Sequence, residues 1–171
     1  MTAREQEEYS ALRTTIRERG TARVWIFVVG IIAWAALTTA TAALASTPLA
    51  VLLPLLVLAT TFEAVFALHV GVERIGRYLQ VVHADAWEQT ATAFGRPKGA
   101  VGIDPLFSVV FLIAALFNFG PVLVVNPIGV ELVFVGCGHV LFVLRVIAAR
   151  ASAARQRAVD LARFQELKPG G

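Results

Sequence analysis

The chain has 171 residues, of which 57% are hydrophobic and only 16% are charged, with a net charge of +3 and a single cysteine, Cys137. A soluble domain of this length carries a larger charged fraction and spreads its apolar residues periodically, so this composition is typical of a membrane protein. One thiol excludes an internal disulfide and a cysteine-based metal site.

The charged residues are gathered in three segments. All fifteen lysines and arginines lie in residues 1–23, 71–104 and 145–171, and ten of the twelve acids lie there too. Basic residues beside membrane spans mark the cytoplasmic side. The positive charge therefore follows from membrane topology, and no basic stripe with interleaved aromatic residues indicates a nucleic acid partner.

Residues 1–23 are predicted to form an amphipathic cytoplasmic helix, with Thr2 as the N-cap and Gly20 as its end. Residues 24–45 follow as the first transmembrane span. The stretch Ala43-Leu44-Ala45 resembles a signal-peptidase site. The segment before it is long and acidic, however, and the apolar run is longer than that of an ordinary signal peptide, so we expect an uncleaved span.

A second span is predicted over residues 48–70, with a cytoplasmic helical extension to about Phe94. We expect Pro54 to kink this helix. His83 and Asp85 are expected on the solvated surface of the extension, since helix geometry points them to different sides. Glycine and proline in residues 95–104 predict a loop.

A third span is predicted over residues 105–125, a fourth over 127–148 and a cytoplasmic helical tail over 149–171. Small residues form a ridge along the tail, and we expect this ridge to pack on the extension of the second span or on a second copy of the chain: Ala151, Ala154, Ala158 and Ala162. The pattern predicts an all-α polytopic membrane protein. It is a four-transmembrane-helix bundle with cytoplasmic helical extensions, placed in the cell (cytoplasmic) membrane with both termini cytoplasmic.

Ionisable residues inside the predicted spans are the candidates for function. An isolated charge in hydrocarbon is costly, so Glu63 is expected to be neutral, paired or next to a wet cavity. Glu63 lies fifteen residues past Pro48 and His139 lies twelve past Pro127. Their depths therefore differ by about 4–5 Å. A Glu63–His139 contact near mid-membrane is geometrically open, and Asn118 reaches a similar depth.

Two interpretations of these residues follow. One is a proton or cation path, with Glu131 at the outer mouth, Glu63 and His139 in the middle, and His69 and Glu73 at the inner mouth. The other is a hydrogen-bonded cluster that fixes helix register and subunit contacts. We favour the cluster.

We expect no enzyme and no cofactor. Glu63 and His139 could in principle act as acid and base on a lipid, which leaves a lipid-directed membrane enzyme as an alternative, but no nucleophile or metal ligand set lies nearby. The sequence contains no glycine-rich phosphate loop, no G-x-S-x-G and no H-E-x-x-H. His69 and His139 differ in depth by about 13 Å, so one chain cannot bind haem through both, although a symmetric oligomer could use His139 from two copies. We expect a non-catalytic, self-associating membrane subunit or scaffold that docks a cytoplasmic protein. The alternative is an oligomeric proton or cation channel or transporter that uses Glu63, His139 and Asn118.

Overall fold

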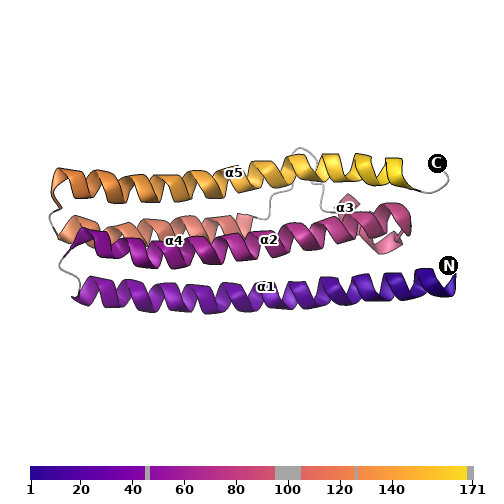
Figure 1. Cartoon of the computed structure of the whole chain (residues 1–171), viewed down its shortest axis with the longest axis horizontal. Coiled ribbons are helices and arrows are strands. Elements are labelled where there is room, and N and C mark those ends of the chain that lie inside the picture. Colours follow the sequence, from indigo (N-terminus) through magenta and orange to yellow (C-terminus); the bar gives the residue numbers. More distant parts are fainter. Residues whose placement is uncertain (45–46, 95–104, 126, 169–171) are drawn as a thin grey trace. The chain divides into compact units, whose positions relative to one another are not determined.

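The computed structural model describes residues 1–44, 47–94, 105–125 and 127–168, and within these ranges every regular element is a helix. The elements are α1 (Ala3–Leu44), the 3-10 helix η1 (Pro48–Val51), α2 (Leu52–Val82), α3 (Ala86–Phe94), α4 (Pro105–Val124) and α5 (Gly129–Leu167), as Figure 1 shows. The all-helical prediction is confirmed for these residues. The predicted loop over residues 95–104 lies outside the described residues.

The chain forms two compact units. The first, here called the apolar unit, comprises Val24–Val65 and Asp104–Ala149. The second, the polar unit, comprises Met1–Arg23, Phe66–Ile103 and Arg150–Gly171. The helices α1, α2 and α5 each contribute residues to both units.

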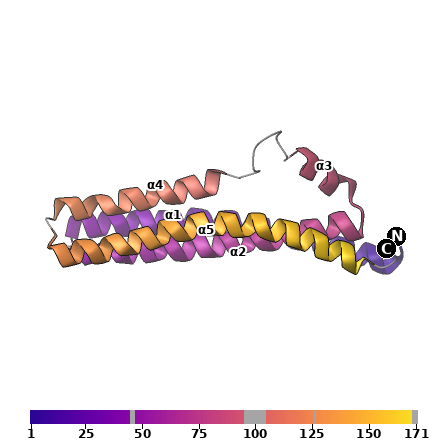
Figure 2. The ribbon, with the colours of Figure 1, turned by 90° about the horizontal axis from the view of Figure 1, so that it is seen from above.

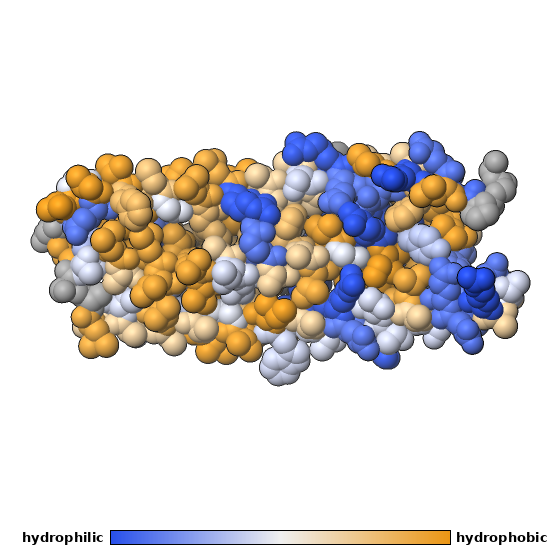
Figure 3. All heavy atoms as spheres, viewed as in Figure 1, coloured by the Kyte–Doolittle hydropathy of each residue, from blue (hydrophilic) through white to orange (hydrophobic). Residues whose placement is uncertain are grey.

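Three helical stretches are long and apolar enough to cross a membrane: Ala3–Leu44, Pro48–Val82 and Gly129–Leu167. The helix α4 adds a shorter apolar stretch, Ser108–Val124. The face of the apolar unit seen in Figure 3 is mostly hydrophobic, and Leu116 and Val130 are 73% and 77% exposed. Exposed apolar area of this extent is unfavourable in water and suits a bilayer, which is consistent with a membrane helical protein.

The core of the apolar unit is built from aromatic and branched side chains. Its helical segments lie along roughly the same axis in both views, with α1 and α4 running opposite to α2 and α5 (Figures 1 and 2). The ring of Phe62 meets Phe111 and Phe142 edge to face, with centroids 5.2 and 6.1 Å apart. The helices α1 and α2 lie close together at Gly30, where an added Cβ would lie 2.2 Å from Thr61 Cγ2. The Gly30 site therefore admits only glycine.

The N-terminal helix begins as predicted and ends elsewhere. Thr2 Oγ1 accepts a hydrogen bond from the Glu5 N–H at 3.3 Å, and Glu5 Oε2 accepts one from the Thr2 N–H at 2.7 Å, which is a reciprocal capping box. Gly20 does not end the helix, so that prediction is wrong. Glycine inside a helix costs only about 1 kcal/mol relative to alanine, and α1 continues unbroken to Leu44.

Two predictions about the second span are corrected. Pro54 lies in the first turn of α2, because η1 precedes it, and a first-turn proline has no α-helical hydrogen bond to break. The continuous extension to about Phe94 is also wrong. α2 ends at Val82, Ala84 adopts a left-handed φ of 50°, and Asp85 Oδ1 accepts from the Trp87 N–H at 2.8 Å to begin α3.

The helix α5 confirms the helical tail as far as Leu167. The alanine ridge does not pack on α2, however: Ala151, Ala154, Ala158 and Ala162 are all exposed. Within the polar unit, α5 meets α2 through Asp160, which pairs with Arg77, and through Phe164, whose ring centroid lies 5.5 Å from that of Tyr78. The ridge remains a predicted contact for a second copy.

Candidate functional site

Asn118 and His139, two of the residues predicted to lie at a similar depth, meet in the apolar unit. The Asn118 side chain is fully buried. Its Oδ1 accepts hydrogen bonds from Trp34 Nε1 at 3.2 Å and from Thr38 Oγ1 at 3.3 Å. Its Nδ2 donates to the Val51 carbonyl oxygen at 2.9 Å and lies 3.1 Å from His139 Nε2. We call these five residues the Asn118 cluster.

The hydrogen bonds fix the tautomer of His139. Its Nδ1 lies 2.9 Å from the Val135 carbonyl oxygen, which can only accept, so Nδ1 carries the hydrogen. In a neutral imidazole Nε2 is then an acceptor, and the Asn118 amide donates to it. The ring of Phe119 covers His139 edge to face, with centroids 5.0 Å apart.

The cluster is closed as a hydrogen-bonding system. A primary amide offers two donors and two acceptor positions, and Asn118 uses all four. If His139 Nε2 were protonated, its N–H would face the N–H groups of the Asn118 amide, and two donors would then point at each other. Turning the amide over would in turn set its NH2 against the Trp34 N–H, which cannot accept. Both ring nitrogens of His139 are engaged within one chain, so His139 does not fit the haem ligand considered from the sequence.

Glu63 does not meet His139. Its Oε2 accepts from Arg145 Nη2 at 2.7 Å, and the side chains of Glu63 and Arg145 are 47% and 43% exposed. The Arg145 guanidinium also lies over the Phe62 ring, 6.0 Å from its centroid. The Glu63 carboxylate is therefore paired, which is one of the three states expected for it, but with a partner that the sequence did not indicate.

Glu131 caps a helix. It lies in the first turn of α5, where its Oε2 accepts from the Ile128 N–H at 3.2 Å while the Ile128 carbonyl accepts from the Leu132 N–H at 3.0 Å. A carboxylate at this position satisfies a backbone donor and the positive end of the helix dipole. The capping contacts explain the position of Glu131 without assigning it to the outer mouth of a proton or cation path.

His69 and Glu73 lie together in the polar unit, in a network of charged groups. His69 Nδ1 lies 2.8 Å from Arg23 Nη1, and its Nε2 lies 3.5 Å from Glu73 Oε1. Glu73 also accepts two hydrogen bonds from Arg157, at 2.6 and 3.1 Å, in the forked geometry that arginine and carboxylate prefer. The network links α2 to α5.

The polar unit contains a second charged cluster that was not predicted from the sequence. Asp85 Oδ2 accepts from Tyr9 at 2.7 Å and from Arg13, and Arg13 also donates to Glu88 at 2.8 Å. These contacts tie α1 to the start of α3. The side chains of His83 and Asp85 are each 6% exposed, so the expected solvated position is wrong for both. Burial alone would raise the pKa of Asp85, but hydrogen bonds from Tyr9, the Glu88 backbone and Arg13 outweigh it and lower the pKa.

Six residues predicted from the sequence thus fall into four separate places. Asn118 and His139 share one cluster, His69 and Glu73 share another, Glu63 pairs with Arg145, and Glu131 caps α5. Among the described residues there is no group of three or more side chains that could hold a metal ion. Comparison with protein-family models, with curated proteins and with solved structures finds no match for this chain.

Proposed function

We propose that the chain is a non-catalytic, self-associating membrane subunit. In this proposal it is a four-span bundle in the cytoplasmic membrane, with α4 as the third span and both termini on the cytoplasmic side. The grouping of all basic residues in residues 1–23, 71–104 and 145–171 supports this orientation. The polar unit then lies in the cytoplasm and is the part available to a soluble partner.

The observation that carries the proposal is the closed Asn118 cluster. Every hydrogen-bonding position of the Asn118 amide is used by its neighbours, and His139 is held as one neutral tautomer. A proton path needs groups that exchange partners, whereas a cluster that fixes helix register needs partners that stay. The arrangement supports the structural role over the channel.

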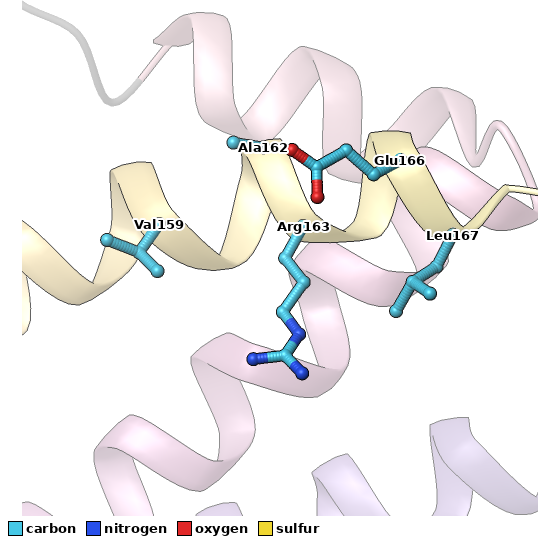
Figure 4. A pocket seen from close by; sticks show the side chains of 5 residues that line it. All are labelled: Val159, Ala162, Arg163, Glu166 and Leu167. Carbon is cyan, nitrogen blue, oxygen red and sulfur yellow. The ribbon is translucent and has the colours of Figure 1, made fainter.

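The exposed side of α5 supports docking at the polar unit. Val159, Ala162, Arg163, Glu166 and Leu167 line a shallow hollow of about 500 Å³ there. Val159 and Leu167 are 62% and 66% exposed, and Val159, Arg163 and Leu167 extend from the same side of the helix (Figure 4). A surface with two exposed apolar side chains, a base between them and an acid beside them suits an amphipathic helix of a cytoplasmic partner.

Proton flux in proteoliposomes tests this proposal against the channel. After a pH jump, we expect dye signals of the wild type, Glu63→Gln and His139→Ala to match those of empty vesicles at every potential and with every cation tried. A protonophore added last shows that the gradient was intact. Wild-type flux that both substitutions abolish, in protein that is still folded and assembled, would contradict the proposal and establish the channel.

A further inference from the structure

The Glu63–Arg145 pair is exposed at a depth where charges are expensive. Glu63 lies fifteen residues beyond Pro48. At 1.5 Å per residue this is about 22 Å along the helix, inside a hydrocarbon layer about 30 Å thick. Both side chains remain more than two-fifths exposed in the single chain. Because lipid tails solvate such groups poorly, a polar surface is needed opposite the pair.

The pair closes one end of a groove between α2 and α5. The groove has a volume of about 320 Å³, and its walls are two stripes at helical spacing, Leu52, Leu55, Leu56, Ala59 and Glu63 on α2, and Gly138, Leu141, Phe142 and Arg145 on α5. Leu56 and Leu141 are 61% and 67% exposed at its rims. At its floor, a Cβ added to Gly138 would lie 3.2 Å from the side chain of Leu52.

The two walls run in the same direction. Gly138 lies against Leu52 and Leu55, and seven residues later Arg145 meets Glu63. The negative and the positive group therefore lie side by side at one depth. A two-fold rotation about the membrane normal keeps every residue at its own depth. It places α2 of each copy opposite α5 of the other copy.

We propose that this groove is the interface with a second copy of the chain. Glu63 of each copy then faces Arg145 of the other, so that two internal ion pairs become a ring of four alternating charges shielded from lipid. Leu56 and Leu141 of each copy cover the groove of the other. The inference rests on the proposed self-association and names its surface. A phospholipid phosphate is the less suitable occupant, because the pair has no net charge and Glu63 would repel it.

Charge-reversal variants of Glu63 and Arg145, alone, mixed and combined, test the proposed interface. Glu63→Arg places two positive groups in a copy, and Arg145→Glu places two negative groups there. Each variant alone should lose the dimer, with a dissociation constant raised about tenfold or more, because like charges face each other across the axis. Mixed in the same vesicles, the two variants should form a heterodimer. The double variant Glu63→Arg with Arg145→Glu should dimerise like the wild type.

The measurement is energy transfer between labelled copies in lipid vesicles, with Phe117→Ala on α4 as a lipid-facing control that should leave dimerisation unchanged. Circular dichroism checks that each variant is folded. Single variants that dimerise like the wild type, or that stay monomeric when mixed, would overturn this interface while self-association stands. A co-purified phospholipid that the single variants lose would assign the groove to lipid instead. A wild type that is monomeric at all densities would contradict the proposed self-association itself.

Discussion

Asn118 shows how one residue can join several helices. Its four hydrogen bonds join side chains from α1, α4 and α5 to the backbone of η1. Hydrocarbon offers no substitute partners, so each of these polar groups depends on the others. The cluster selects one arrangement of the helices rather than merely holding them together.

Replacing Asn118 by leucine should therefore destabilise the apolar unit. Leucine keeps the volume but leaves the Val51 carbonyl, Trp34, Thr38 and His139 each with one bond fewer. We expect the free energy of unfolding to fall by about 1–3 kcal/mol. Titration with sodium dodecyl sulfate, followed by tryptophan fluorescence, measures this loss.

Substitutions of two threonines provide a variant with a smaller expected loss of stability and a control. Thr38→Val removes one of the four bonds and should cost less than Asn118→Leu. Thr39→Val removes a hydroxyl that is exposed and bonds only to Ala35 of its own helix, so stability should stay near that of the wild type. Equal stability of Asn118→Leu and Thr39→Val would show that the cluster contributes nothing.

At the scale of residues, the sequence placed Asn118 and His139 at a similar depth but did not give the partner of Glu63. Counted from Pro127, His139 is twelve and Arg145 eighteen residues deep, while Glu63 is fifteen from Pro48. His139 and Arg145 are therefore each three residues from the depth of Glu63, so depth alone could not show which of them is its partner. The choice depends on which side of α5 faces α2 at Glu63, and that is set by packing of the whole unit.

The break between α2 and α3 is the main difference at the scale of helices. The apolar stripe continues past residue 82, which is why one long helix was predicted. A second signal was present, however: Asp85 followed by Glu88 is the spacing of an N-cap and its third helical residue. Gly30 gave no such signal, because its close approach to Thr61 involves a residue distant in sequence.

The tie between α1 and α3 should depend on pH. The folded state lowers the pKa of Asp85, so the ionised carboxylate stabilises the fold when the pH is above the ordinary pKa of aspartate. This stabilisation is lost as the pH falls below about 4. Hydrogen-exchange protection of the α3 amides should fall with it.

Asp85→Asn isolates the charge from the cap. Asparagine caps helices about as well as aspartate, so α3 should still begin at the same place, but its protection should be low at all pH values. Glu18→Gln, an exposed acid on α1, should behave like the wild type. A pH profile of Asp85→Asn that matches the wild type would exclude Asp85 as the titrating group.

For the whole molecule, the sequence predicted the class of protein, and tertiary contacts decided its internal divisions. Blocks of apolar residues separated by charged segments were sufficient to predict membrane helices. The same pattern suggested a separate N-terminal helix, yet α1 is continuous through Gly20 and belongs to both units. Ion pairs such as Arg77–Asp160, at 2.9 Å, join segments far apart in the sequence and are not readable from local pattern.

The number of spans gives a prediction for the whole chain. In a Cys137→Ser background, an impermeant maleimide should label Ile128→Cys in intact cells, and should label Glu7→Cys and Lys168→Cys only after permeabilisation. Both ends are then cytoplasmic, which requires an even number of spans. Labelling of position 168 but not position 7 in intact cells would mean an odd number and would contradict α4 as a span.

The Asn118 cluster also bears on biosynthesis. In the proposed four-span bundle, a ribosome delivers α1 and η1 first, so Trp34, Thr38 and the Val51 carbonyl enter the bilayer before the amide that joins them. His139 arrives last. Until α4 and α5 are inserted, the unfinished bundle carries unsatisfied polar groups in lipid, a chemical mark by which a translocon or a membrane protease can distinguish an incomplete chain from a finished one.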